Sequence, residues 1–315
     1  MGVAFLEVIV AGRPNPDGDR GHVEMDLGLL AGVSDRGHRL GGRNEDAMAL
    51  ATCQSPDGRP VALAVVCDGL SVSPRSDEAS LVAAQAAIQV LLAGARTGTD
   101  PEATSLDAVR TALGRLRDMA GADGAPACTY ASAVVGPDGV TVCWLGDCRV
   151  YWLAAPPGDV PTPGSPDESA QPAGGRPGWP ASRLLTSDDS LAAELVASGL
   201  MSEEEAIASP QAHVIIQWLG ADATDPTPHV AQFQPAGTGA ILVCSDGLSY
   251  HHPEAGDLAG LALPAGLTNP LDAAIALVQA AYDARGLDNI TAVLVPFPPS
   301  TNNLAQVSQD LGQPD

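Results

Sequence analysis

Short apolar runs separated by turn residues recur along the chain and predict β-strands. The runs are rich in Val, Ile, Leu and Ala, as expected for strands that are buried in a sheet. They cover residues 61–67, 131–135, 140–145, 149–153, 241–244 and 290–295. The sequence Gly136-Pro137-Asp138-Gly139 lies between two of the runs and predicts a hairpin turn. These features indicate antiparallel sheets.

Three segments space their apolar residues by three or four positions and predict helices. The first begins near Ser76 and stops at Gly94, and the second follows Ser105. The third opens at Asn269-Pro270 and ends by Gly286. Because the strands are grouped in hairpins and the helices in blocks, we expect an α+β fold in which helices cover antiparallel sheets.

The remaining segments define the expected domain organisation. Residues 1–27 are weakly patterned and are expected to form an N-terminal segment before a domain of residues 28–297. Residues 155–182 are rich in Pro and Gly and predict a long loop. Residues 188–212 predict a compact helical segment, with a capping-box spacing at Ser202 and Glu205. Residues 298–315 are expected to be a flexible tail.

Composition narrows the class of protein. A chain of 315 residues with 45% hydrophobic content can bury a sizeable core, and a formal charge of −23 disfavours nucleic acid and anionic membranes as partners. The six cysteines form no CxxC pair, which favours reduced, mostly buried thiols. The N-terminal stretch lacks a basic region, and no run of 18 apolar residues occurs. We expect a monomeric protein in the cytoplasm.

Four acidic motifs, most of them at one end of an apolar run, carry the chemistry. They are Asn44-Glu45-Asp46, Cys67-Asp68-Gly69, Cys244-Ser245-Asp246-Gly247 and Asp288-Asn289-Ile290-Thr291. An Asp-Gly pair after a strand is more often a turn than a ligand, but several such motifs together favour a shared site. Clustered carboxylates stay ionised at neutral pH only beside positive charge, and hard divalent cations prefer oxygen ligands. The sequence therefore predicts a metal site.

Taken in order, six motifs resemble the bacterial metal-dependent protein phosphatases, the PPM-type or protein phosphatase 2C-like serine/threonine class. The motifs are Ser34-Asp35-Arg36-Gly37 with Arg43-Asn44-Glu45-Asp46-Ala47, Val66-Cys67-Asp68-Gly69, Gly146-Asp147-Cys148-Arg149-Val150-Tyr151, Leu185-Thr186-Ser187-Asp188, Cys244-Ser245-Asp246-Gly247-Leu248 and Asp288-Asn289-Ile290-Thr291. The resemblance covers residues 28–297 and implies an αββα sandwich of two antiparallel sheets flanked by helices.

The resemblance also implies roles for single residues. Asp68 matches the Asp that bridges two Mn²⁺ or Mg²⁺ ions, and the Gly69 carbonyl matches a ligand of the second ion. Asp246 and Asp288 match further ligands of the first ion, while Glu45 and Asp46 match the acidic pair beside the second. The implied reaction is attack of a metal-bridged hydroxide on a phosphoserine or phosphothreonine of a protein that a Ser/Thr kinase has phosphorylated.

A third ion is implied at Asp147, shared with Asp246. Thr129 occupies a position where the family often has a small hydroxyl residue. The first motif is one residue longer than the common form, so the phosphate-binding arginine matches either Arg39 or Arg43, with a slight preference for Arg39.

Two motifs depart from the family pattern. The loop Asp68-Gly69-Leu70-Ser71-Val72-Ser73 lacks the usual second glycine pair and histidine, which leaves protonation of the leaving group to water. Asp188-Asp189-Ser190 replaces Asp-His-Ser and places an extra carboxylate near the helical segment. Both aspartates fit a role beside the site and a role at a helix N-terminus, where the helix dipole stabilises them, equally well. An active phosphatase is the leading hypothesis, and the alternatives are a phosphatase-like binding module without catalysis and a hydrolase of small phosphorylated metabolites.

Overall fold

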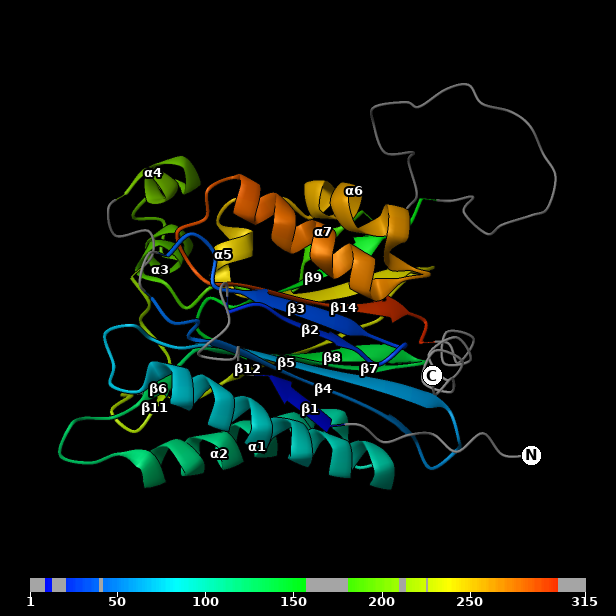
Figure 1. The fold of residues 1–315 in the computed structure, drawn as a ribbon, viewed down its shortest axis with the longest axis horizontal. Helices are drawn as coiled ribbons and strands as arrows, with labels where there is room; N and C mark the ends of the chain where they lie inside the picture. Colours follow the sequence, from blue (N-terminus) through cyan, green and yellow to red (C-terminus); the bar gives the residue numbers. More distant parts are fainter. Residues whose placement is uncertain are drawn as a thin grey trace, which may run out of the picture.

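Four layers, helix, sheet, sheet and helix, make up the computed structural model of the chain (Figure 1). It describes residues 9–12, 21–39, 42–156, 181–209, 214–224 and 226–299. Most of the predicted loop 155–182 and of the predicted tail 298–315 lies outside these residues. The architecture is the α+β sandwich of two antiparallel sheets that the sequence predicts.

The first sheet has six strands in the order β1-β4-β5-β7-β8-β12, and neighbours pair antiparallel. Its strands are β1 (Ile9–Gly12), β4 (Asp46–Gln54), β5 (Pro60–Asp68), β7 (Tyr130–Gly136), β8 (Gly139–Leu145) and β12 (His229–Phe233). Gly136 and Gly139 close the β7–β8 hairpin as the turn sequence predicts. A small two-stranded sheet, β6 (Ala127–Cys128) with β11 (Leu219–Gly220), lies at one end of the molecule.

The second sheet also has six strands, in the order β10-β9-β13-β14-β3-β2. Its strands are β2 (Val23–Asp26), β3 (Ala31–Asp35), β9 (Arg149–Ala154), β10 (Arg183–Leu184), β13 (Gly239–Cys244) and β14 (Ile290–Phe297). The N-terminal part of the chain contributes to both sheets, because β1 pairs with β4 and β2 pairs with β3.

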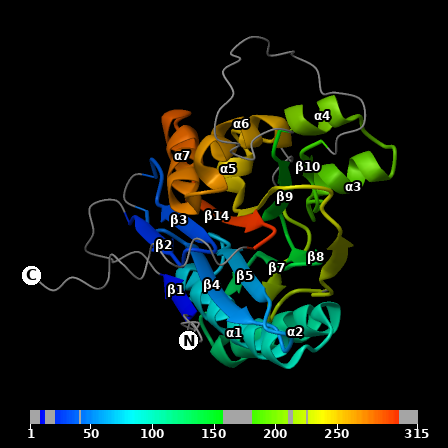
Figure 2. The same ribbon diagram turned by 90° about the vertical axis from the view of Figure 1, so that its right-hand side faces the viewer.

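Helices cover the outer face of each sheet (Figure 2). The helices are α1 (Ser76–Thr97), α2 (Pro101–Met119), α3 (Leu191–Ala197), α4 (Glu203–Ala208), α5 (Asp246–Ser249), α6 (Ala255–Gly266) and α7 (Pro270–Asp283). The pair α1 and α2 packs on the first sheet, and the pair α6 and α7 packs on the second. The expected helical segment 188–212 contains α3 and α4, and the predicted capping box between Ser202 and Glu205 is present.

Side chains alternate between the two faces of β5, so a single apolar run contributes to two hydrophobic cores. In β5, Leu63 and Val65 face α1 and α2, whereas Ala62, Ala64 and Val66 face the second sheet. Both faces are buried, so the run shows no polar alternation in the sequence. The apolar side chains packed between the two sheets fix the strand ends of one sheet relative to those of the other. The acidic motifs lie at those ends.

Helix boundaries differ in detail from the predictions. The first helix continues past Gly94 to Thr97 and ends at Gly98, which has a left-handed backbone. The second helix begins at Pro101, not after Ser105, because the Asp100 carboxylate caps the amide of Ala103. The third helix begins at Pro270 with Asn269 as its cap, as predicted.

By length and composition alone, helix α1 is apolar enough to cross a membrane, although the sequence contains no uninterrupted run of 18 apolar residues. Half of its most apolar window is buried inside the protein, where it packs against β4, β5 and α2. The apolar composition of α1 is therefore that of a helix packed in the core.

Candidate metal centre

Carboxylates from five separate segments meet at one end of the sandwich. Asp46 begins β4 and Asp68 ends β5, and the two residues are directly opposite each other in the antiparallel ladder. Asp246 follows the end of β13, and Asp288 precedes β14 on the neighbouring strand of the other sheet. Asp147 lies in the turn between β8 and β9. Like charges directly opposite in a sheet repel each other, so this arrangement needs a compensating positive charge.

Asp46 is buried with one oxygen engaged and one left over. Its Oδ2 accepts hydrogen bonds of 2.7 Å from both Ser245 and Thr291, while Oδ1 is buried without a hydrogen-bond partner among the described residues. Burial, together with the charges of Asp288 and Asp246, raises the pKa of Asp46 to about 7 in spite of the hydrogen bonds from Ser245 and Thr291, which lower it.

Asp68 and Asp147 experience the same environment. Burial and the charge of Asp46 raise the pKa of Asp68 well above its ordinary value, with further contributions from Asp246, Asp147 and Asp288. Burial and the charge of Asp246 likewise raise the pKa of Asp147, whose Oδ1 is also buried and unpartnered within the described part of the chain. The structure therefore brings five predicted carboxylates close enough to repel one another.

Glu45 differs from these carboxylates because it is fully hydrogen-bonded. Its Oε2 accepts from Arg39 and from Ser71, each at 2.7 Å, and its Oε1 accepts from Ser76 at 2.7 Å. Burial would raise the pKa of Glu45, but the hydrogen bonds from Ser71 and Ser76 and the charge of Arg39 hold it below its ordinary value. Glu45 therefore stays ionised and fixes Arg39 beside the centre.

The two candidate arginines differ in their contacts and in their exposure. Arg39 Nη1 lies 2.7 Å from Glu45 Oε2 and 3.7 Å from Asp288 Oδ1, and Arg39 Nη2 donates to Ser71 Oγ at 3.0 Å. Arg43 pairs only loosely, at 3.5 Å, with Asp77, and its side chain is 77% exposed against 31% for Arg39. Arg39 is thus the arginine held at the acidic centre.

Two glycines allow the close backbone approach on which the centre depends. A Cβ on Gly69 would lie 2.5 Å from the carbonyl oxygen of Ser76 and 2.8 Å from that of Glu45. A Cβ on Gly247 would lie 2.0 Å from the carbonyl oxygen of Asn289. Each Asp-Gly motif therefore needs its glycine for packing space, in addition to any role of the Gly69 carbonyl.

Asp188 and Asp189 are anchors and do not form a helix N-terminus, since Ser190 caps α3. Asp188 makes a bidentate pair with Arg149, with N–O distances of 2.9 and 2.7 Å. The extra carboxylate, Asp189, is buried; its Oδ2 accepts from the amide of Gly146 at 2.9 Å, and its Oδ1 lies 2.8 Å from Nε2 of His229. Asp189 thereby ties the turn that carries Asp147 to strand β12.

Thr129 lies directly beneath the centre. Its amide donates to the carbonyl of Asp68 at 2.7 Å, and its hydroxyl accepts from the amide of Asp68 at 3.2 Å. The hydroxyl also lies 3.0 Å from the thiol of Cys148. All six cysteines are free and buried, as the sequence predicts.

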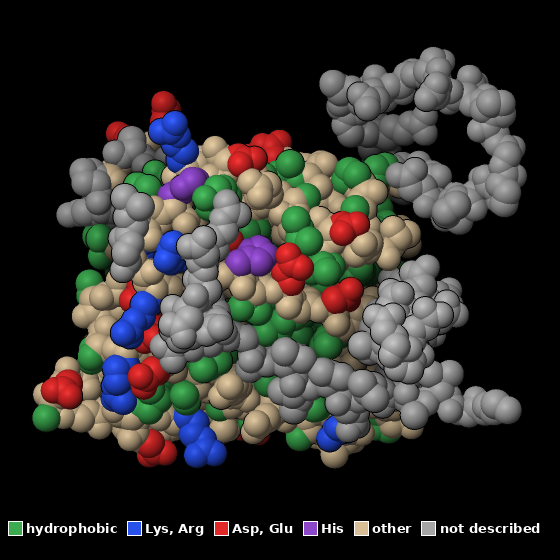
Figure 3. Space-filling view, in the orientation of Figure 1, with side chains coloured by type: hydrophobic (Ala, Val, Ile, Leu, Met, Phe, Trp, Pro, Cys, Tyr) green, Lys and Arg blue, Asp and Glu red, His purple; other side chains and the backbone are tan. Residues whose placement is uncertain are grey.

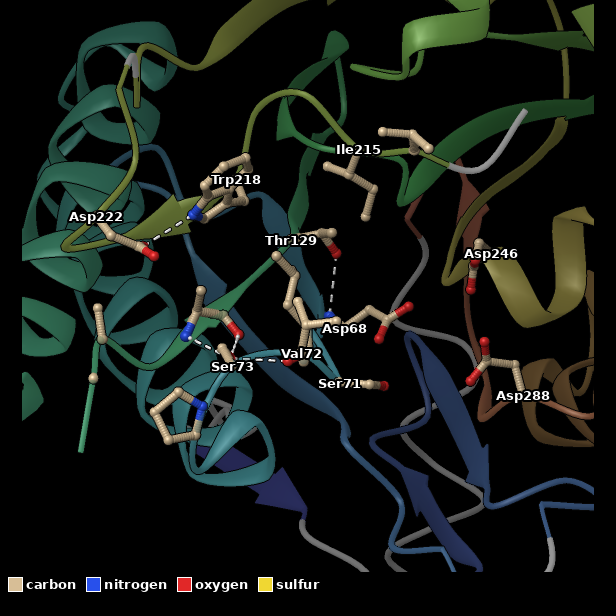
Figure 4. Close-up of a pocket in the computed structure, with 17 residues that line it drawn as sticks. Asp68, Ser71, Val72, Ser73, Thr129, Ile215, Trp218, Asp222, Asp246 and Asp288 are labelled. Carbon is tan, nitrogen blue, oxygen red and sulfur yellow. Dashed lines mark hydrogen bonds between the residues drawn. The ribbon is translucent and has the colours of Figure 1, made fainter. Parts of the chain in front are cut away.

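A cleft of about 650 Å³ opens over the centre (Figure 4). Asp68, Asp246 and Asp288 line one part of it, and the loop 69–74 and residues around Trp218 line the rest. A second recess of about 400 Å³ shares Asp246 and Asp288 and is lined also by His251 and Arg285. On the face drawn in Figure 3, most basic side chains lie toward the end of the molecule that carries α3 and α4.

The chemistry of the donor atoms, which are carboxylate and carbonyl oxygens, suits a hard divalent cation. Among the described residues, no group of three or more His, Cys, Asp or Glu is arranged so that it could hold a metal ion directly. The carboxylates instead repel one another across the centre, and Asp46 and Asp147 each present a buried oxygen that accepts no hydrogen bond from the described residues. Oxygen donors of this kind suit Mn²⁺ or Mg²⁺, and Mg²⁺ commonly keeps several waters as ligands.

Sequence reasoning did not identify the polar residues that hold the acidic side chains. Ser71 and Ser76 fix Glu45, Ser245 and Thr291 fix Asp46, and the Asn289 carboxamide accepts from the amide of Glu45 at 2.7 Å. Ser245, Asn289 and Thr291 stand inside the acidic motifs, so their positions were a usable signal.

Comparison with known proteins finds a likeness to residues 36–170 in sequence and to most of the chain in fold. Residues 36–170 match the family model described as Protein phosphatase 2C. The chain is 33% identical over 129 residues to the serine/threonine phosphatase stp of Listeria innocua, a match over 41% of this chain and 47% of that protein. The chain thus spans about half the length of the curated relatives that it matches.

Solved structures extend the likeness over most of the chain. The serine/threonine phosphatase Stp1 from Staphylococcus aureus superposes with a TM-score of 0.63 at 22% identity, over 87% of this chain and 97% of that one. The catalytic domain of the serine threonine protein phosphatase PstP, solved in complex with two manganese ions, superposes with a TM-score of 0.60 at 22% identity, over 85% of this chain and 97% of that one. The ordered motifs, the family-model match over residues 36–170 and the shared sandwich make this chain similar to the PPM-type, protein phosphatase 2C-like family.

Proposed function

We propose that this chain hydrolyses phosphoserine and phosphothreonine in proteins with the help of two Mn²⁺ or Mg²⁺ ions. The observation that carries the proposal is the meeting of five carboxylates, from five separate segments, at one end of an open cleft with Arg39 at its margin. The relatives that the chain resembles are named as serine/threonine phosphatases, and one structural neighbour holds two manganese ions.

The residues take the following parts in this proposal. Asp68, Asp246 and Asp288 would hold one ion, and Asp68 with the carbonyl of Gly69 would hold the other, beside Glu45 and Asp46. Asp147, with Asp246, would hold a third ion where one is bound. When bound, such ions lower the pKa of a water to near 7 and offset the negative charge that develops on phosphoryl oxygens.

The protein itself positions the phosphate. Arg39 is the basic side chain held at the centre, and only two of its hydrogen bonds among the described residues, to Glu45 and Ser71, are used in holding it. The planar guanidinium therefore keeps donors that can grip phosphate oxygens. No histidine lines the cleft within the described residues, so we assign protonation of the leaving hydroxyl to water.

We further propose that the substrates are proteins phosphorylated by Ser/Thr kinases and that the chain acts in the cytoplasm as a monomer. Six free, buried cysteines support a reducing compartment. The charge of −23 supports neither nucleic acid nor an anionic membrane as a partner. A phosphatase-like binding module remains the alternative function, and hydrolysis separates the two.

The test is phosphate release from a phosphothreonine peptide and from p-nitrophenyl phosphate, with and without Mn²⁺. We expect turnover that needs the metal and falls by roughly 100-fold or more in Asp246→Asn, since several kcal/mol of transition-state stabilisation are lost. Asp272→Asn, an exposed aspartate in the first turn of α7, is the charge-matched control. Metal binding without turnover in the wild-type protein would instead establish the binding module.

A further inference from the structure

The cleft extends well beyond the acidic centre, and its far part has a different character. Asp246 and Asp288 lie at one end, Asp68 lies between, and Trp218 and Asp222 lie at the other end (Figure 4). The walls in between are mostly apolar, and no Arg or Lys is among the lining residues within the described part of the chain. A volume of about 650 Å³ falls in the range of sites that bind small ligands or side chains.

Trp218 and Asp222 form a fixed pair at the far end. The indole Nε1 donates to Asp222 Oδ1 at 3.1 Å, which orients both side chains. Gly220 makes this turn possible, because a Cβ there would lie 2.8 Å from the same carboxylate oxygen. Trp218 is half-buried and Asp222 is exposed, so the aromatic face and a carboxylate are both open to a ligand.

This end of the cleft is joined rigidly to the metal centre. Leu219 and Gly220 form strand β11, which pairs with Cys128 and Ala127 of strand β6. Cys128 in turn forms a bridge with Gly69, the residue that follows Asp68. One short ladder and one isolated bridge therefore set the position of the Trp218–Asp222 pair relative to Asp68.

The loop 69–74, which lines the cleft next to Asp68, presents an apolar side chain to solvent. Val72 is 95% exposed, although its loop is anchored by the Ser73 hydroxyl, which donates to the carbonyl of Leu70 at 2.8 Å and accepts from the amide of Ala127 at 3.2 Å. Val72 therefore offers apolar contact area to a ligand at the margin of the cleft.

We propose that this part of the cleft binds an arginine side chain of the substrate, close in sequence to the phosphorylated residue. The inference deepens the proposed phosphatase function and rests on it. The aliphatic stem of the arginine lies between Val72 and Trp218, and its guanidinium stacks on the indole and pairs with Asp222.

Charge complementarity selects this occupant. The chain carries a formal charge of −23, and every ionisable residue that lines the cleft among the described residues is an aspartate. At the centre, divalent cations balance this charge, but Asp222 stands apart from the centre and draws a cation from the substrate. An arginine suits both the apolar wall and the carboxylate, whereas an acidic flanking residue is repelled.

The test is a positional scan. Phosphoserine peptides carry one arginine in turn at each position from three before to three after the phosphoserine, with alanine elsewhere, and kcat/KM is compared with that of the all-alanine peptide. We expect one position to raise kcat/KM by about 5- to 20-fold, as for an exposed cation–π contact combined with a surface ion pair. In Asp222→Asn this preference falls by roughly two- to fivefold, and in high salt it weakens.

Asp257→Asn is the control, because it removes the same charge from an exposed position in the first turn of α6 and leaves the preference unchanged. Equal gains at all positions, or a preference that Asp222→Asn and Asp257→Asn alter alike, would show general electrostatic attraction and overturn the proposal. A preference for leucine over arginine at the selected position would overturn it in favour of a purely apolar site.

A second measurement keeps the two proposals separate. Fluorescence anisotropy of the same labelled peptides, with a phosphonate in place of the phosphate ester, reports binding whether or not hydrolysis occurs. Loss of turnover with retained, Asp222-dependent arginine preference would refute the phosphatase function alone. Turnover without any arginine preference would refute the arginine site alone.

Discussion

Repulsion within the acidic centre predicts that removing one of its buried carboxylates stabilises the metal-free protein. Removing a buried polar group usually has the opposite effect, because its partners lose their hydrogen bonds. Asp46 is buried opposite Asp68 and near Asp246 and Asp288, and its pKa is raised to about 7. A raised carboxyl pKa contributes stability that is present at low pH and is lost as the pH rises through the folded-state value. The metal-free protein should therefore become less stable as the pH rises from about 4 to about 7.

The magnitude follows from the size of the pKa change. Raising the pKa from 3.8 to about 7 costs about 4 kcal/mol at pH 8, at 1.36 kcal/mol for each pKa unit. Asp46→Asn removes this cost but weakens the hydrogen bonds from Ser245 and Thr291. We expect Asp46→Asn to be more stable than the wild type by about 1–4 kcal/mol at pH 8 in EDTA.

The assay is urea unfolding in EDTA at pH 5 and pH 8, repeated with Mn²⁺. Asp189→Asn is a control with the opposite sign, since the buried carboxylate of Asp189 accepts from the amide of Gly146 at 2.9 Å and lies 2.8 Å from Nε2 of His229, contacts that the substitution weakens. We expect Asp189→Asn to be destabilised by about 1–3 kcal/mol. Mn²⁺ should stabilise the wild type and stabilise Asp46→Asn much less. If Asp46→Asn is as stable as the wild type or less stable in EDTA at pH 8, repulsion between Asp46 and the neighbouring carboxylates is refuted.

Three further outcomes follow from the geometry. Arg39→Ala should lower kcat/KM for a phosphothreonine peptide by about 10- to 100-fold, as expected for the loss of a charge-assisted hydrogen bond. Arg43→Ala should change kcat/KM by less than about threefold. Steady-state kinetics would show the reverse if Arg43 held the phosphate. Gly247→Ala places a Cβ 2.0 Å from a backbone oxygen and should destabilise the fold by about 1–3 kcal/mol. Gly260→Ala, in open space on α6, should instead stabilise it by about 0.5–1 kcal/mol, and chemical denaturation of the pair tests both statements.

Local sequence signals identified the strands that are rich in Val, Ile and Leu but not those that are rich in Ala. Strand β4 (Asp46–Gln54) has the sequence DAMALATCQ, and its alanines favour helix in isolation. It is a strand because both faces are buried, one against α1 and the other against the second sheet, which no local pattern shows. The early start of α2 was readable, since Asp100-Pro101 is a capping sequence.

Most of the aspartates of the centre were identifiable because they follow or precede an apolar run, whereas Asp46 begins β4, which the local pattern did not identify. Their supporting contacts were not identifiable, since they join distant segments: Ser71 reaches Glu45 across 26 residues of sequence, and Ser245 reaches Asp46 across 199. The choice between Arg39 and Arg43 likewise depended on the position of the Glu45 carboxylate. The departure from the family pattern at Ser71 is explained in the same way, because its hydroxyl links Arg39 to Glu45.

The most direct test of the central claim is the location of Mn²⁺ in a crystal of the protein, measured by anomalous scattering at the manganese edge. We expect two peaks between the carboxylates of Asp46, Asp68, Asp246 and Asp288, with any third peak beside Asp147. Manganese bound elsewhere, or no peak among these carboxylates at a saturating concentration, would contradict the account.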